Sequence, residues 1–323
     1  MSPLPSPASR GEGGPGTSLL ELRDLHVEFS TYGGGGKAVR GVSLEVERGR
    51  TLAVVGESGC GKSVTFQAAM GLIPSPPGRV TRGSARFDGA ELVGAPVEAL
   101  NRIRGKDVGM IFQDPMTSLN PTMKVGRQIT EALRYHEGLA GGAARARSIE
   151  LLERVRIPEA AVRVDHYPFQ FSGGMRQRVM IAMAIACRPK LLVADEPTTA
   201  LDVTVQAQIL DLLRGLQREN GMAIVLITHA LGVVAQMADE VAVMYAGQIV
   251  ERGSVDDVFY RPAHPYTLGL QQAMPTDAEG ARARLEPIEG SPPDLFSPPP
   301  GCGYLERCPL AAEACGPDLP PLR

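Results

Sequence analysis

The stretch TLAVVGESGCGKS, from Thr51 to Ser63, joins an apolar run to a glycine-rich turn that ends in lysine and serine. Its apolar half predicts a buried strand, and a helix is expected to begin at Lys62. The turn GESGCGKS matches the spacing G-x-x-x-x-G-K-S/T without deviation, in the strand–loop–helix context that this motif needs. Its backbone N–H groups can surround phosphate oxygens, Lys62 can reach the β- and γ-phosphates, and the Ser63 hydroxyl can bind Mg²⁺. The stretch therefore predicts an α/β fold that binds a nucleotide.

Contact with the nucleotide is expected along this whole segment. Its residues are Gly56, Glu57, Ser58, Gly59, Cys60, Gly61, Lys62, Ser63 and Val64. The neighbours of Cys60 are expected to lower the pKa of its thiol. We therefore expect Cys60 to react with alkylating agents, but not to act as a catalytic thiol.

Composition limits the remaining possibilities. The 323 residues contain 43% hydrophobic and 21% charged residues, which is typical of a globular protein with a sizeable core. The formal net charge of −3 argues against nucleic-acid binding by bulk electrostatics. The longest apolar run, VMIAMAIAC, lies between Arg178 and Arg188 and is too short to span a membrane. No signal-peptide pattern precedes it, so we expect a cytosolic chain that could still reach a membrane through a partner.

The order of patterns predicts an α/β core with a helical insertion. Alternating strands begin at Leu19, mostly helical patterns fill the region from about 121 to 187, and strands return from Lys190. A hairpin in EVAVMYAGQIVERG is expected to turn at Ala246-Gly247. We divide the chain into a disordered leader at 1–17, an α/β nucleotide-binding domain at 18–260 with a helical subdomain at about 120–187, and a proline-rich extension at 261–323.

Acidic residues end one of the predicted buried strands. In LLVADEP, Asp195 and Glu196 lie at the carboxyl end of the strand, where open α/β sheets bind ligands. Asp195 is placed to hold the Mg²⁺ shell, and Glu196 is placed to polarise an attacking water. A solvated acidic turn is the alternative, and the phosphate-binding turn makes the catalytic interpretation the stronger one.

Two further strand ends carry polar side chains. LITHA places His229 at the same sheet edge, where its imidazole could contact a γ-phosphate instead of being an ordinary hydrogen-bonded loop histidine. IFQDP places Gln113 after another strand, where its amide oxygen could bind Mg²⁺ or the attacking water. From the residues alone, Gln-Asp-Pro is only a turn.

A second anion site is predicted far from the first. In FSGGMRQRVMIAMAIA, Ser172, Gly173 and Gly174 precede a helical pattern, and the N–H groups at such a helix start attract anions.

Together these motifs resemble an ATP-binding cassette (ABC) ATPase. GESGCGKS, IFQDP, FSGGMRQR, LLVADEP, TALD and LITHA occur in the order typical of that family, over residues from about 19 to 255. The resemblance implies a P-loop NTPase fold with a RecA-like core, an N-terminal antiparallel β subdomain and an inserted α-helical subdomain. It also implies a head-to-tail dimer, in which the Ser-Gly-Gly helix of one ATPase covers the ATP held by the other.

The resemblance also assigns roles by position. Lys62 and Ser63 bind ATP and Mg²⁺, and Gln113 couples the site to transmembrane subunits. Ser172 and Gly174 contact ATP across the dimer, and Asp202 in TALD links the two sites. Adenine is expected to stack on Tyr32, with Phe29 as the alternative.

Two positions depart from the family pattern. Ala230 replaces the aspartate that commonly follows the histidine, and Phe171 replaces the leucine that commonly precedes Ser-Gly-Gly.

The end of the chain resembles a subgroup of this family. YRPAHPYTLGLQQAMP and GCGYLERCPLAAEAC are similar to the extension of ATPase subunits from oligopeptide, dipeptide and nickel importers. This implies a partner ATPase, identical or different, two permease subunits, an extracytoplasmic solute-binding protein, and a location on the cytoplasmic face of the membrane. A cassette exporter and a nickel importer are the alternatives. DNA-repair cassettes carry long coiled-coil insertions and translation-factor cassettes carry two P-loops, and neither feature is present in this sequence.

Three cysteines cluster near the end. Cys302, Cys308 and Cys315 have the spacing C-x₅-C-x₆-C, and an odd number of thiols in a reducing compartment disfavours disulfides. Thiolates suit zinc or an iron–sulfur cluster. The resembling extension often holds a 4Fe–4S cluster on four cysteines, so we expect such a cluster here with a fourth ligand not identified. Three unrelated thiols are the alternative.

Overall fold

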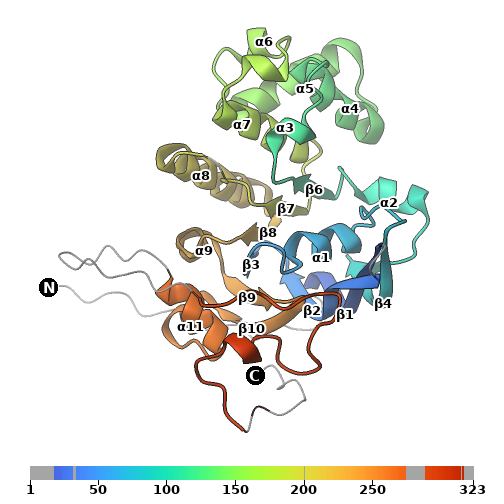
Figure 1. Ribbon diagram of the computed structural model, residues 1–323. Helices are drawn as coiled ribbons and strands as arrows, with labels where there is room; N and C mark the ends of the chain where they lie inside the picture. The colour runs from blue at the N-terminus through green and yellow to red at the C-terminus, as the bar shows by residue number, and fades with distance from the viewer. Residues whose placement is uncertain (1–17, 32–33, 200, 274–287, 314, 316–323) are drawn as a thin grey trace, which may run out of the picture.

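A six-stranded sheet carries the predicted phosphate-binding loop at the end of its third strand. The computed structural model describes residues 18–31, 34–199, 201–273, 288–313 and 315 (Figure 1). The sheet has the order β10-β9-β3-β8-β7-β6, and only the edge pair β9 and β10 is antiparallel. Its strands are β3 (Thr51–Val55), β6 (Val108–Ile111), β7 (Leu191–Asp195), β8 (Ala223–Thr228), β9 (Glu240–Tyr245) and β10 (Gln248–Ser254). Every residue of β3, β7 and β8 is buried, as expected for parallel strands covered on both faces.

An antiparallel sheet of order β2-β1-β4-β5 packs beside the first. It consists of β1 (Ser18–Thr31), β2 (Gly34–Glu47), β4 (Gly78–Phe87) and β5 (Ala90–Glu91). Its buried side chains alternate along β2 and meet Phe66 of α1 (Lys62–Ala69) and apolar residues of the other sheet in one core. The predicted RecA-like core and N-terminal antiparallel β subdomain are both confirmed, and the hairpin turns at Ala246-Gly247 as predicted.

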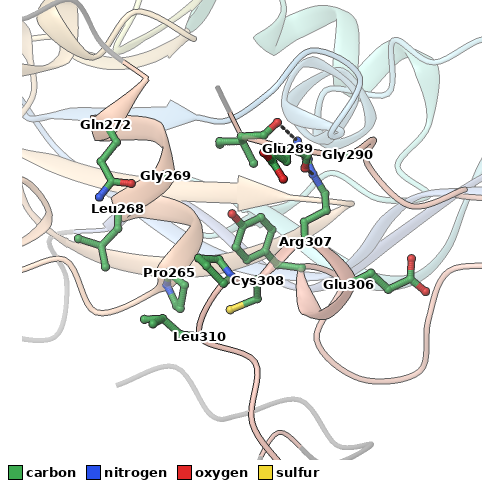
Figure 2. A pocket seen from close by; sticks show the side chains of 13 residues that line it. Pro265, Leu268, Gly269, Gln272, Glu289, Gly290, Glu306, Arg307, Cys308 and Leu310 are labelled. Atoms are coloured by element: carbon green, nitrogen blue, oxygen red, sulfur yellow. Dashed lines mark hydrogen bonds between the residues drawn. The ribbon is translucent and has the colours of Figure 1, made fainter. Parts of the chain in front are cut away.

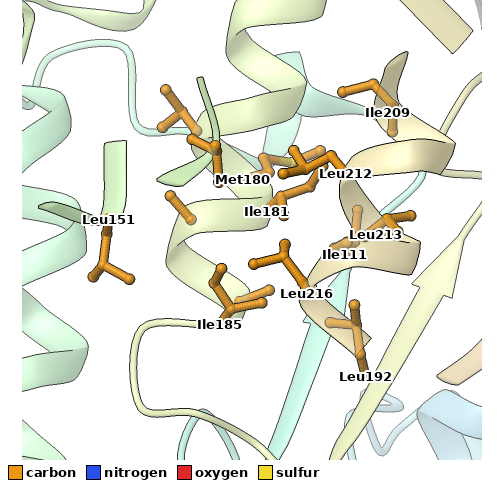
Figure 3. Close-up of a cluster of buried hydrophobic side chains, with 14 of the residues drawn as sticks. Ile111, Leu151, Met180, Ile181, Ile185, Leu192, Ile209, Leu212, Leu213 and Leu216 are labelled. Atoms are coloured by element: carbon orange, nitrogen blue, oxygen red, sulfur yellow. The ribbon is translucent and has the colours of Figure 1, made fainter. Parts of the chain in front are cut away.

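Helices fill the region between β6 and β7. They are α3 (Pro115–Ser118), α4 (Val125–Glu137), α5 (Gly141–Arg154), α6 (Ala160–Arg163), the 3₁₀ turn η1 (Pro168–Gln170) and α7 (Gly173–Ala184). Most of α7 is buried, including Arg178, which donates to the Val155 carbonyl at 2.9 Å and to Gln208 Oε1 at 2.8 Å. Figure 3 shows Ile181 and Ile185 in one buried cluster with Leu212, Leu213 and Leu216 of α8 (Val203–Asn220). The helical insertion is thus anchored to the sheet through α8.

The C-terminal extension packs against residues of β3 and β9 in the large sheet. It follows α10 (Val255–Tyr260) and contains α11 (Pro265–Gln272) and the 3₁₀ turn η2 (Leu305–Arg307). The rings of Tyr245, Tyr266 and Tyr304 form its centre, with centroids 4.5 to 5.3 Å apart. The remaining helices are α2 (Val97–Ile103) and α9 (Leu231–Met237). Across the described ranges, no helix is long and apolar enough to cross a membrane.

Two predictions fall on residues that the structure does not describe. The leader at 1–17 and Tyr32 both lie outside the described ranges. The proposed domain boundaries stay predictions.

Truncating Leu213 should test the role of α8 as the anchor of the helical insertion. Leu213→Ala removes a fully buried side chain and should lower the free energy of unfolding by about 2–5 kcal/mol. Val162→Ala, at a position that is 60% exposed, is the control and should change it by less than about 0.5 kcal/mol. Urea unfolding followed by circular dichroism measures both, and equal effects would contradict this packing.

Candidate nucleotide-binding site

The loop between β3 and α1 needs glycine because it passes close to other backbone segments. A Cβ at Gly56 would lie 2.1 Å from the Met244 carbonyl oxygen, and one at Gly61 would lie 2.4 Å from the Ala38 carbonyl oxygen. Both glycines also have positive φ, at 152° and 103°. These are conformations and distances that a side chain would not tolerate. The loop therefore presents bare backbone at the N-terminus of α1, as a phosphate-binding turn requires.

Lys62 is folded back onto its own loop. Its ammonium donates to the carbonyl oxygens of Gly56 and Glu57, both at 2.8 Å, and the side chain is almost fully buried. These two bonds stabilise the buried charge of Lys62. A phosphate placed in the loop would offer Lys62 a charged acceptor in exchange for two neutral ones.

The prediction that the pKa of the Cys60 thiol is lowered is wrong. Burial raises the pKa of its thiol, and this outweighs the opposing effect of Lys62, whose Nζ lies 3.7 Å from the sulfur. The charge of Lys62 is visible in the sequence, but the burial of Cys60, which is only 6% exposed, is not. The thiol is mainly protonated at neutral pH and is not activated.

Ser63 and Asp195 meet as the predicted metal-binding pair. The Ser63 hydroxyl donates to Asp195 Oδ1 at 2.9 Å, and Asp195 is 3% exposed. Burial raises the pKa of Asp195 above its ordinary value, and the Ser63 hydrogen bond offsets this only in part. A hydroxyl and a carboxylate oxygen are hard ligands that suit Mg²⁺, and a cation would compensate the buried negative charge. The pair therefore fits the metal.

Glu196 lies at the centre of a hydrogen-bonded group. Its Oε2 accepts from Gln113 Nε2 at 3.0 Å and from the Thr199 hydroxyl at 2.8 Å, and its Oε1 lies 3.2 Å from His229 Nδ1. Burial alone would raise the pKa of Glu196, but the hydrogen bonds from Thr199, His229 and Gln113 outweigh it and hold the pKa below its ordinary value. The carboxylate is therefore ionised at neutral pH and able to accept a proton.

Thr199 is the member of this group that the sequence did not predict. Its hydroxyl reaches the carboxylate because Glu196 adopts a left-handed conformation, with φ of 47°, and turns the chain back after β7. A threonine three residues after the acidic pair was the only available signal. Gln113, Glu196 and His229 do come together as predicted, from the ends of three neighbouring parallel strands.

The Ser-Gly-Gly motif and Asp202 lie apart from the phosphate-binding loop in the folded chain. Ser172 caps α7 by accepting from Met175 N at 3.3 Å, and Asp202 caps α8 by accepting from Val205 N at 2.9 Å. A Cβ at Gly174 would lie 2.7 Å from Val205 Cγ1, while Gly173 faces open space. Figure 1 places α7 in the helical layer, well apart from α1. Within the described residues, no hydrogen bond or ion pair joins these motifs to the phosphate-binding loop.

Phe29 was the alternative to Tyr32 for stacking on adenine. Its ring is half-buried and packs against the core of the antiparallel sheet, close to Gly78. The ring therefore has a structural role whether or not adenine also touches it.

The cysteines near the end of the chain do not form a metal site in the described residues. The sulfur of Cys302 lies 3.9 Å from His264 Nε2, Cys302 and Cys308 pack against the tyrosine cluster, and Cys315 is exposed. Throughout the described part, no group of three or more His, Cys, Asp or Glu side chains could hold a metal ion. The arrangement therefore does not fit the expected iron–sulfur cluster. Cys308 instead lines a cavity of about 1130 Å³ between α11 and the segment around η2 (Figure 2).

Comparisons with known proteins agree with this geometry. The family described as ABC transporter matches residues 39–199, and the family described as oligopeptide/dipeptide transporter, C-terminal region, matches residues 250–315. The chain is 56% identical over 306 residues to the oligopeptide transport ATP-binding protein OppD of Bacillus subtilis (strain 168), covering 95% of this chain and 86% of that protein. It is 54% identical over 298 residues to the dipeptide transport ATP-binding protein DppD of the same strain, covering 92% and 88%.

A solved structure shares the fold. It is the dimeric ATP-binding cassette MJ0796 in a post-hydrolysis state, bound to ADP and Pi. The two chains superpose with a TM-score of 0.66 at 26% identity, over 73% of this chain and 99% of that one.

The raised pKa of Asp195 predicts a stability change with a definite sign. A carboxyl whose pKa is higher in the folded than in the unfolded chain destabilises the fold as pH rises through the unfolded and then the folded pKa. Asp195→Asn keeps an acceptor for Ser63 and removes the charge, so it should raise the melting temperature at neutral pH without metal. The gain should shrink as pH falls towards the ordinary range of a carboxyl group. Thermal melts in a chelating buffer across this range measure the effect, and a lower melting temperature at neutral pH would contradict it.

Proposed function

This chain belongs to the ABC transporter family, among the OppD- and DppD-type ATP-binding subunits, and we propose that it hydrolyses ATP to power the import of oligopeptides or dipeptides. The observation that carries the proposal is the Glu196 carboxylate, held by Gln113, Thr199 and His229 at the sheet edge where Ser63 also meets Asp195. The identity to OppD and DppD over more than nine-tenths of the chain supports the substrate class.

Each side chain of the site has a part in the proposed hydrolysis. Lys62 exchanges its two loop carbonyls for the β- and γ-phosphates of ATP. Glu196 accepts a proton from the attacking water, because its hydrogen-bond donors keep it ionised. His229, 61% exposed at its side chain, can reach a γ-phosphate with the ring nitrogen that does not face Glu196.

Ser63, Asp195 and Gln113 would hold Mg²⁺, which would neutralise charge on the phosphates. The proposed function assigns no role to an iron–sulfur cluster.

The proposed working unit is a dimer of ATPase subunits on two permeases. Ser172, Gly173 and Gly174 are exposed or half-buried and lie apart from the loop of their own chain, so they are free to cover ATP bound by a partner ATPase. Dimerisation of the related cassette MJ0796 supports this arrangement. In the complex the chain lies at the cytoplasmic face of the membrane, and an extracytoplasmic solute-binding protein delivers the peptide.

Replacing Glu196 should separate ATP binding from hydrolysis. Glu196→Gln leaves the phosphate-binding loop intact and removes the proton acceptor, so the complex should bind ATP while its turnover falls by about a hundredfold to ten-thousandfold. Phosphate release by the purified complex measures turnover. Glu219→Gln, which alters a largely exposed carboxylate at the end of α8, should keep full activity. Turnover of Glu196→Gln near that of the unaltered complex would refute the assignment.

Replacing Ser172 should test the shared site. Ser172→Arg should leave the ATP affinity of the isolated subunit unchanged. The phosphate-binding loop, including Lys62, lies far from α7 within one chain. Turnover of the assembled complex should fall by about a hundredfold or more, because the arginine would block closure over the partner's ATP. Ser172→Ala, which keeps the glycines, should have a smaller effect. Loss of ATP affinity in the isolated Ser172→Arg subunit would contradict the shared site.

A further inference from the structure

In the described residues, the hydrogen bonds from the C-terminal extension to the phosphate-binding loop all go to Glu57, from Tyr266 and from Arg307. We propose that Tyr266 and Arg307 are positioning residues that fix the conformation of this loop through Glu57, and so set the affinity for ATP. The proposal rests on the proposed function in one respect, which is that the loop binds ATP.

Arg307 holds the side chain of Glu57. Its Nη1 donates to Glu57 Oε2 at 2.9 Å and its Nη2 donates to Glu57 Oε1 at 3.1 Å, which is the two-point geometry that gives the strongest arginine–carboxylate pairs. The arginine side chain is only 7% exposed, so solvent screens this pair less than it screens a surface ion pair.

The guanidinium of Arg307 is itself fixed in place. It donates to the carbonyl oxygens of Glu289 at 2.8 Å and Ile288 at 3.1 Å, and to the Tyr245 hydroxyl at 3.1 Å. Figure 2 shows the arginine side chain directed at the segment that contains Glu289 and Gly290. Burial works against the charge of Arg307, but the bonds to Glu57 and Tyr245 outweigh it and hold the pKa above its ordinary value. Arg307 thus links two separate segments, residues 288–289 and the end of β9, to Glu57.

Tyr266 holds the backbone of Glu57. The Glu57 N–H donates to the Tyr266 hydroxyl at 2.8 Å, and Tyr266 is fully buried among the rings of Tyr245 and Tyr304. Removing the hydroxyl would leave this N–H without its protein acceptor, and the loss is costly because Tyr266 is buried.

A buried carboxylate on β10 fixes the turn that carries Tyr266. Glu251, 8% exposed, accepts from Ala263 N at 2.7 Å, from His264 N at 3.0 Å and from the Thr267 hydroxyl. A buried carboxylate that lost these donors would be strongly destabilising, so the start of α11 is held firmly to the large sheet. Tyr266 therefore presents its hydroxyl to the loop from a rigid support.

Glu57 passes this restraint to the lysine of the loop. Its carbonyl oxygen accepts from Lys62 Nζ at 2.8 Å, so the N–H, the side chain and the carbonyl of this one residue are all engaged. The extension fixes the first two, and the third holds Lys62 beside the loop until a phosphate takes its place. A loop already held in one conformation loses less conformational freedom when ATP binds, which is why the restraint should strengthen binding.

The main test removes one hydroxyl. In the full-length chain, Tyr266→Phe keeps the ring and should weaken ATP binding by about tenfold. Tyr304→Phe, in the same ring cluster but without a bond to the loop in the described residues, is the matched control and should bind ATP normally. In the assembled complex, Tyr266→Phe should raise KM for ATP while kcat changes less than about twofold, because Glu196 and its partners are untouched. A lower kcat with unchanged KM would overturn the proposal.

A double-mutant cycle tests whether Arg307 acts through Glu57. Arg307→Ala should weaken ATP binding by about tenfold or more, whereas Arg261→Ala, at an exposed ion pair on the same extension, should have no effect. In a Glu57→Ala background, Arg307→Ala should add little further loss, because the route to the loop is already broken. Arg307→Lys should recover only part of the affinity, since an ammonium cannot make the two-point contact. Additive losses in the cycle would overturn the proposal.

The outcomes distinguish this inference from the proposed function. If the unaltered chain failed to bind ATP, the proposed function would be wrong. If the unaltered chain bound ATP and Tyr266→Phe, folded and with a normal melting temperature, bound it equally well or more tightly, the extension would not position the loop.

Discussion

Parallel pairing of β3, β8, β7 and β6 is the constraint on which the site depends. Parallel strands end at the same edge, so the residues that follow them gather there although the chain between them is long. Ser63 after β3 meets Asp195 at the end of β7, and Gln113 after β6 and His229 after β8 meet Glu196. The helical insertion, the antiparallel sheet and the extension pack against the large sheet and its helices, and none of them contributes one of these side chains.

The sequence predicted this edge because each strand there is short, apolar and followed by a polar residue. It could not predict what depends on burial or on distant pairing. The pKa of Cys60 was misjudged because the charge of Lys62 is visible in the sequence and the burial of the thiol is not. The spacing of Cys302, Cys308 and Cys315 suggested a metal cluster, but spacing does not say which way side chains point. The contact between Arg307 and Glu57 joins residues 250 positions apart, and no local pattern marks it.

The Ser-Gly-Gly motif and Asp202 form one packed unit, although no pattern in the sequence pairs them. Gly174 lies against Val205, and the N–H of Val205 is the group that Asp202 caps. A side chain at Gly174 would push against the first turn of α8 and disturb that cap. The starts of α7 and α8 should therefore move together, and whatever approaches one helix start also meets the other.

The bonds from Tyr266 and Arg307 to Glu57 also set an order of events during protein synthesis. The ribosome makes the phosphate-binding loop early, but the arginine that holds it is added 250 residues later. At typical rates of 5–20 residues per second, roughly 12–50 s separate the two. During that interval the nascent loop lacks part of its support, so an unfinished chain should hold nucleotide less firmly than a finished one. Synthesis of the extension thus acts as a built-in delay before the loop receives its full support.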